Sequence, residues 1–229
     1  MGAERPCGAK TVHSSGTLRD DVHLWVAAVA PGSPEVKRLQ AAAGPAERAR
    51  AARFHRLEDA ERYLAAHGAL RMILAGFMAC DPVDLRFSTH KKGKPFIEGA
   101  DLEFNLSHSG ALALIAVALR RQVGVDIERL RPIPDLEDLV AGVCTAGERA
   151  ALAALEEPVR ERAFLGMWTR KEALVKMTGE GLDALPQADS REAHEGCRLV
   201  ELRDLSGYAA WVAAEGSEWQ LVRHYLNGR

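Results

Sequence analysis

Aromatic residues and excess charge are scarce in this chain, and the lack of excess charge excludes two kinds of partner. Aromatic side chains make up 6% of the 229 residues, and the formal net charge is −2 at pH 7. Charges this evenly balanced create no overall field that would attract nucleic acid or a membrane surface, so we expect neither as a partner. A site for an anionic ligand must therefore be a local patch of basic side chains.

Paired cysteines and long apolar runs are missing as well. The four cysteines lie far apart, without the spacing of a zinc site or of a CxxC redox motif. The longest apolar run, residues 111–119, has the length of a strand and not of a membrane span. Residues 1–22 contain no apolar signal-peptide core. We therefore expect a cytoplasmic protein with no part in the membrane.

Two long helices, each followed by strands, dominate the predicted secondary structure. Apolar residues at three- and four-residue steps predict a helix at 58–80, and a second is predicted at 159–177. The predicted strands lie at 22–30, 85–88, 103–106, 112–119, 123–128, 198–202, 208–214 and 219–225. This order predicts an α+β fold of two similar lobes. We expect a flexible segment at 1–20, an N-terminal lobe at 21–120 and a C-terminal lobe at 121–229.

The sequence VGVDIE at 123–128 places two carboxylates on one side of an apolar strand. Side chains alternate along a strand, so the core-facing residues are Val123, Val125 and Ile127. Asp126 and Glu128 then face the other way, about 7 Å apart, and repel each other unless a cation lies between them. Oxygen ligands of this kind favour Mg²⁺ or Mn²⁺ over zinc. The same residues also fit a solvated edge strand whose acids pair with Arg129 or Arg131.

The sequence WTRKEALVK at 168–176 predicts a helix with a polar stripe. Trp168, Glu172 and Lys176 are spaced by four residues and share one face. Glu172 can supply a third carboxylate, and Lys176 can reach a phosphate as a point charge. The alternative is a surface Glu–Lys pair beside a tryptophan that only packs.

The sequence FNLSHSG at 104–110 predicts a polar turn after a strand. Ser107, His108 and Ser109 would lie in this turn, where hydroxyl, amide and imidazole groups can surround an anion. Serine and histidine in adjacent positions point apart on an extended chain, so they form no catalytic dyad. The alternative is a turn that only satisfies its own hydrogen bonds.

Basic residues gather in two neighbouring stretches. Five arginines precede or lie on the first long helix, and three lysines crowd the turn after it: Arg50, Arg53, Arg56, Arg62, Arg71, Lys91, Lys92 and Lys94. Such runs are usually solvated surface. The turn has few matching acids, however, so the cluster can also bind the phosphate groups of a small anionic ligand.

Together these motifs resemble those of the 4′-phosphopantetheinyl transferases of the larger, Sfp type. The resemblance rests on RARAARFHRLEDAER, LRFSTHKKGKP, FNLSHSG, VGVDIERLRP and WTRKEALVKMTGEGL, in this order. It implies two α+β lobes related by a pseudo-twofold, with coenzyme A and Mg²⁺, or alternatively Mn²⁺, in the cleft between them. The implied reaction moves 4′-phosphopantetheine from coenzyme A to a serine of an acyl or peptidyl carrier protein and releases adenosine 3′,5′-bisphosphate.

The resemblance also implies a role for individual residues. The positions that match the metal-binding carboxylates are Asp126, Glu128 and Glu172, and Glu172 is also our candidate for the base. The positions that match coenzyme A contacts are Arg50, Arg53, Lys94, Ser107, His108, Lys171 and Lys176. Among these, His108 would lie near the 3′-phosphate and Lys176 near the pyrophosphate, where it would act in catalysis.

The implied partner is a helical, usually acidic carrier domain. We expect it to dock near residues 129–148, where Leu130, Ile133 and Leu136 either make apolar contacts or pack in the core. Two lobes in one chain complete the cleft and imply a monomer. Two other functions use the same residues: a magnesium-dependent pyrophosphatase acting on coenzyme A, and a coenzyme A binding protein without catalysis. The complete set of carboxylates disfavours the second.

Overall fold

The computed structural model describes residues 21–181 and 196–226. The segment predicted to be flexible, residues 1–20, lies outside the described residues. The first half of the chain contains β1 (Val22–Ala28), α1 (Pro34–Ala41), α2 (Pro45–Ala51), α3 (Leu57–Met78), η1 (Pro82–Asp84), β2 (Ser88–Thr89), β3 (Pro95–Phe96), β4 (Leu102–Ser109) and β5 (Leu112–Leu119). The second half contains β6 (Val123–Arg129), α4 (Leu136–Val143), α5 (Ala146–Ala153), α6 (Val159–Thr178), β7 (Cys197–Glu201), β8 (Tyr208–Glu215) and β9 (Leu221–Leu226).

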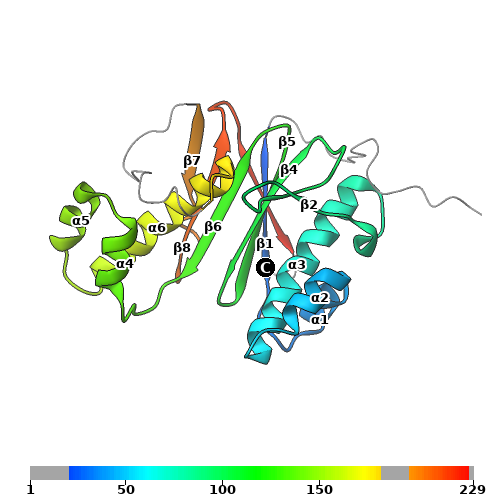
Figure 1. The fold of residues 1–229 in the computed structure, drawn as a ribbon, viewed down its shortest axis with the longest axis horizontal. Helices are drawn as coiled ribbons and strands as arrows, with labels where there is room; N and C mark the ends of the chain where they lie inside the picture. Colours follow the sequence, from blue (N-terminus) through cyan, green and yellow to red (C-terminus); the bar gives the residue numbers. More distant parts are fainter. Residues whose placement is uncertain (1–20, 182–195, 227–229) are drawn as a thin grey trace, which may run out of the picture.

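Two sheets stand back to back between two long helices, as Figure 1 shows. The four-stranded sheet has the order β4-β5-β1-β9, and the three-stranded sheet has the order β6-β8-β7. The short strands β2 and β3 form a separate two-stranded sheet. Alternate residues of β1 and β5 pack against β6 and β8 to form a core between the sheets. The remaining residues of β1 and β5 pack against α3, while α6 covers the outer face of β8. The predicted α+β class with two α+β regions is confirmed.

Local signals in the sequence account for the helix boundaries. Ser33 caps α1 through a hydrogen bond from the Val36 amide, and proline follows at the first helical position. Thr145 and Glu148 form the capping box that begins α5. The long helices α3 and α6 agree with the predicted ranges to within about two residues. Over the part of the chain that the structure describes, neither helix is apolar enough along its length to cross a membrane.

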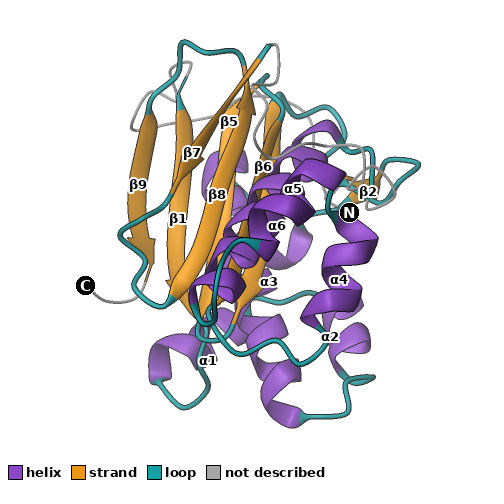
Figure 2. Cartoon of the chain, turned by 90° about the vertical axis from the view of Figure 1, so that its left-hand side faces the viewer, coloured by secondary structure: helices purple, strands orange, loops and turns teal. Residues whose placement is uncertain are grey.

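The last strand differs from the prediction. Residues 219–225 were expected to close the C-terminal lobe, but β9 pairs in parallel with β1 and forms the edge of the N-terminal sheet, as Figure 2 shows. Alternation of side chains identifies a strand in the sequence. It does not indicate which sheet the strand joins. The strand β9 therefore belongs to the N-terminal sheet although it lies late in the sequence, and the division into lobes at 21–120 and 121–229 remains a prediction.

Candidate active site

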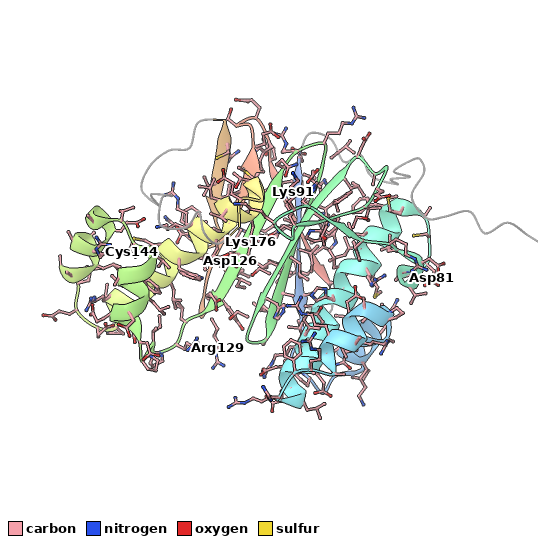
Figure 3. All side chains as sticks on the ribbon, in the orientation of Figure 1. Asp81, Lys91, Asp126, Arg129, Cys144 and Lys176 are labelled. Carbon is pink, nitrogen blue, oxygen red and sulfur yellow. The ribbon has the colours of Figure 1, made fainter. Side chains whose placement is uncertain are left out.

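The carboxylates of β6 point toward α6, on the face opposite the core. The other side chains of the strand are fully buried between the sheets, as alternation predicted: Val123, Val125 and Ile127. Gly124 lies on the same face as Asp126, and a Cβ there would be 2.0 Å from the carbonyl oxygen of Ala173 on α6. Glycine therefore lets helix and strand approach this closely, and Figure 3 shows Lys176 of α6 beside Asp126.

Lys176 and Ser107 hold Asp126 from two sides. The Lys176 ammonium lies 2.5 Å from Asp126 Oδ1, and the Ser107 hydroxyl donates to the same oxygen at 2.7 Å. Lys176 is also 3.7 Å from Glu172 Oε2, one turn earlier on α6. Asp126 is 3% exposed, and its Oδ2 is buried without a hydrogen-bond partner among the described residues. Because buried polar atoms are normally paired, this oxygen is available to a ligand.

Glu128 and Glu172 are acids in a site that is short of positive charge. Burial is the largest cause that raises the pKa of each carboxyl. The Ser109 hydrogen bond opposes this for Glu128 and the Lys176 ammonium opposes it for Glu172, while the nearby Asp126 carboxylate raises the pKa of both. A bound cation would offset both the loss of solvation and the repulsion from Asp126.

The donor chemistry of the site fits a hard divalent ion. Mg²⁺ and Mn²⁺ prefer carboxylate oxygens, and Asp126 Oδ2 is a buried oxygen that such an ion can use. Among the described residues, no three acidic, histidine or cysteine side chains form a group that could hold a metal ion, and Lys176 lies against Asp126. The ligand set of Asp126, Glu128 and Glu172 therefore remains a prediction.

The polar turn predicted at Ser107, His108 and Ser109 is wrong, because β4 continues to Ser109. Alternation along the longer strand divides these residues between two faces. Asn105, Ser107 and Ser109 face β6, where they contact the Val125 amide, Asp126 and Glu128 respectively. The strand predicted at 103–106 ended before Ser107, because polar residues usually mark the end of a strand. The spacing Asn105, Ser107, Ser109 was the signal that the strand continues.

His108 faces the opposite side of β4, toward α3 and the predicted phosphate-binding arginines. Its ring lies 6.4 Å from the ring of Tyr63 on α3, and the Arg50 guanidinium lies 5.5 Å from the same Tyr63 ring. Burial and, next, the Lys176 charge lower the pKa of His108. Arg50 and Arg53 border an open pocket of about 900 Å³ between α2 and the start of α3. The structure thus brings Arg50 close to His108 through Tyr63, a residue that sequence reasoning missed.

Lys94 joins the end of α6 to the beginning of β6. Its ammonium donates to Gln122 Oε1 at 2.7 Å, to the Met177 carbonyl at 2.8 Å and to the Val123 carbonyl at 3.2 Å. Burial lowers its pKa, and the nearby Glu103 opposes this shift. Lys94 also borders a cavity of about 230 Å³, whose charged lining residues are Lys92, Lys94, Glu172 and Lys176. Lys94 therefore lies at the predicted site, but its ammonium is already hydrogen-bonded.

Lys171 is not brought to this site. Its ammonium is 3.0 Å from Glu148 Oε2 and 2.5 Å from the Val143 carbonyl, and the side chains of Lys171 and Glu148 are 2% and 0% exposed. Glu148 also accepts from the Thr145 amide in the capping box of α5. Lys171 thus anchors α5 to α6, and the predicted contact with coenzyme A is replaced by a buried ion pair.

The apolar residues predicted to meet a carrier domain belong largely to a small core. Leu136 is buried among residues of α4, α5 and α6, and Leu130 and Ile133 pack against the same cluster while remaining partly exposed. The core-packing alternative therefore holds for Leu136. The docking position near residues 129–148 remains a prediction.

Comparisons with known proteins place both halves of the chain in one family. A model described as the 4′-phosphopantetheinyl transferase superfamily matches residues 122–225, and one described as 4′-phosphopantetheinyl transferase, N-terminal, matches residues 28–120. The 4′-phosphopantetheinyl transferase HetI of Nostoc sp. is 35% identical over 216 residues, which cover 89% of this chain and 91% of that protein. The 4′-phosphopantetheinyl transferase Sfp of Bacillus subtilis is 31% identical over 172 residues, 74% of this chain and 75% of that protein.

Proposed function

The chain belongs to the 4′-phosphopantetheinyl transferase family, and from this premise we propose its substrates, its metal and the role of each site residue. It moves the 4′-phosphopantetheine group of coenzyme A to a serine of an acyl or peptidyl carrier protein. The serine Oγ forms a bond to the β-phosphorus, and the bond from that phosphorus to the bridging oxygen breaks. Adenosine 3′,5′-bisphosphate leaves with that oxygen.

The contact of Lys176 with two carboxylates, those of Asp126 and Glu172, where α6 meets β6 is the observation that carries this proposal. Lys176 contacts Asp126 and Glu172, while Glu128 follows on the same face of β6. A cation bound by Asp126, Glu128 and Glu172, Mg²⁺ or alternatively Mn²⁺, would neutralise charge on the pyrophosphate oxygens. Lys176 is placed to add a second positive charge there.

Glu172 is the group that we propose as the base. A carrier serine at its normal pKa is a poor nucleophile and needs a base. Glu172 lines the same cavity as Lys94 and Lys176, so its carboxylate can reach a hydroxyl group that enters this cavity. Glu172 therefore accepts the hydroxyl proton of the serine, directly or through one water molecule.

The basic residues of the N-terminal half are proposed to hold coenzyme A. Arg50 and Arg53 at the open pocket, with His108 on the neighbouring strand, bind the 3′-phosphate. Lys94 lines the cavity that also contains Glu172, and Ser107 donates to Asp126; these two residues complete the proposed coenzyme A contacts. Lys171 is left out of this set, because it pairs with Glu148.

A product analysis separates the transferase from a pyrophosphatase that uses the same residues. The protein is incubated with coenzyme A and Mg²⁺, with and without a panel of acyl and peptidyl carriers, and the small products are separated and identified. We expect adenosine 3′,5′-bisphosphate only when a carrier with its serine is present. Release of the same amount without a carrier would support the pyrophosphatase instead. The panel also tells which carriers are substrates.

Two further expectations from the sequence remain predictions. A monomer is expected because one chain supplies both sides of the site, and light scattering of the purified protein tests this. The cytoplasmic location is tested by fractionation of cells that make the protein.

A further inference from the structure

The strand that carries the carboxylates is held by side chains of β4. The two strands lie side by side but belong to different sheets, so no strand pairing joins them in the described part of the chain. Instead, every second residue of β4 reaches across to β6. Asn105 Oδ1 accepts from the Val125 amide at 2.9 Å, and the next two contacts end on Asp126 and Glu128.

The single hydroxyl group of Ser109 makes two hydrogen bonds to β6. It donates to Glu128 Oε2 at 2.8 Å and accepts from the Arg129 amide at 3.1 Å. A serine hydroxyl has a single hydrogen, so acceptance from a rigid strand amide leaves its proton directed at the carboxylate. Ser109 thus fixes the direction of the Glu128 carboxylate relative to the backbone of β6.

The two carboxylates of β6 differ in how much they depend on β4. Asp126 has both Ser107 and the Lys176 ammonium against the same oxygen. Glu128 has a longer side chain, and the Ser109 hydroxyl donates to its Oε2. Loss of Ser109 would free the Glu128 side chain, whereas loss of Ser107 would leave Asp126 paired.

We propose that Ser109 is a positioning residue, which fixes the Glu128 carboxylate in the direction needed to bind the divalent ion. This inference rests on the proposed function, because it takes Glu128 to be a metal ligand. Ser109 acts through Glu128, to which its hydroxyl group donates. Groups that hydrogen-bond to metal ligands typically change metal affinity by about 10- to 100-fold when they are removed.

Two variants of equal shape isolate the hydroxyl group. Thr and Val have the same size and both suit a strand, so Ser109→Thr keeps the hydroxyl and Ser109→Val replaces it with a methyl group. Ser88→Ala is the matched control, because Ser88 also donates to a glutamate, Glu98, at 2.9 Å, but on an exposed hairpin. Binding of Mn²⁺ in the presence of coenzyme A is measured by electron paramagnetic resonance, and exchange of the Arg129 amide is measured by NMR.

We expect Ser109→Val to weaken Mn²⁺ binding about 10- to 100-fold and to expose the Arg129 amide to exchange. Transfer at saturating metal should fall much less than the affinity for the ion. Ser109→Thr and Ser88→Ala should stay within a few fold of the wild type. Equal Mn²⁺ affinity in the Thr and Val variants would overturn the role of Ser109 while leaving the transferase intact. A wild-type protein that binds no Mn²⁺ and transfers nothing would overturn both proposals.

Discussion

Gly124→Ala should force α6 away from β6 and so separate Lys176 from Asp126. The added Cβ would lie 2.0 Å from the Ala173 carbonyl oxygen and 2.3 Å from the Met177 amide nitrogen, whereas ordinary contacts begin near 3.4 Å. Both obstacles are backbone atoms, so no side chain can rotate away. Helix and strand must therefore move apart by more than about 1 Å. Overpacking of a core destabilises a fold by about 1–3 kcal/mol, and we expect Gly124→Ala to lie at the upper end of this range.

The consequences can be measured separately for stability and for transfer. For a chain of this size, a loss of about 3 kcal/mol lowers the melting temperature by roughly 6–12 °C. A displacement of about 1 Å at the reacting groups can lower the rate about 100-fold. Thermal unfolding followed by circular dichroism gives the first quantity, and the initial rate of carrier modification below the transition gives the second.

A second glycine supplies the control for this prediction. Gly166 lies on the same helix, and a Cβ added there would meet no atom within 4 Å outside the backbone of the helix itself. Gly166→Ala should therefore stabilise the protein by about 0.5–1 kcal/mol and leave transfer unchanged. If Gly124→Ala were as stable and as active as Gly166→Ala, the close approach of α6 to β6 would not be what positions Lys176.

Two more predictions concern buried groups. Lys171→Met should destabilise the fold by about 3–5 kcal/mol, because Glu148 is left as a buried charge. The KM for coenzyme A should stay the same. Normal stability with a greatly raised KM would instead mean that Lys171 binds coenzyme A. His67 should make the protein less stable in acid, since burial and then the charge of His108 lower its pKa to about 4. Between pH 6.5 and pH 4 the unfolded chain binds a proton at this position and the native chain does not, so stability rises with pH across this window. In urea unfolding, the free energy of unfolding of the wild type should fall by up to about 3 kcal/mol relative to that of His67→Gln as the pH falls from 6.5 to 4. A difference in unfolding free energy that does not change with pH would contradict the burial of a neutral ring.

The arrangement of the carboxylates on β6 and of Glu172 and Lys176 on α6 could be predicted because it is local. Alternation along a strand assigned Asp126 and Glu128 to one face, and four-residue spacing placed Glu172 and Lys176 on one side of the helix. These rules depend on a few neighbouring residues, and the contact between Lys176 and Glu172 follows from them directly.

Contacts between distant segments could not be predicted in the same way. The sequence around Lys171 does not reveal that Glu148 of α5 lies beside it, and both residue types read equally well as surface or site residues. The parallel pairing of β9 with β1 joins the two ends of the chain, and no local pattern identifies that edge. The Ser109 contact to Glu128 depends on how one sheet meets the other, which spacing within β4 alone does not describe.

The mass of a carrier protein is the most direct test of the central claim. A carrier is incubated with coenzyme A and Mg²⁺ and either the wild-type protein or Glu172→Gln, with Glu201→Gln on the exposed strand β7 as control. We predict that the wild type and Glu201→Gln add one phosphopantetheine group to the carrier serine, while Glu172→Gln adds none and still binds coenzyme A. A full mass gain with Glu172→Gln, or none with the wild type across the carrier panel, would contradict the account.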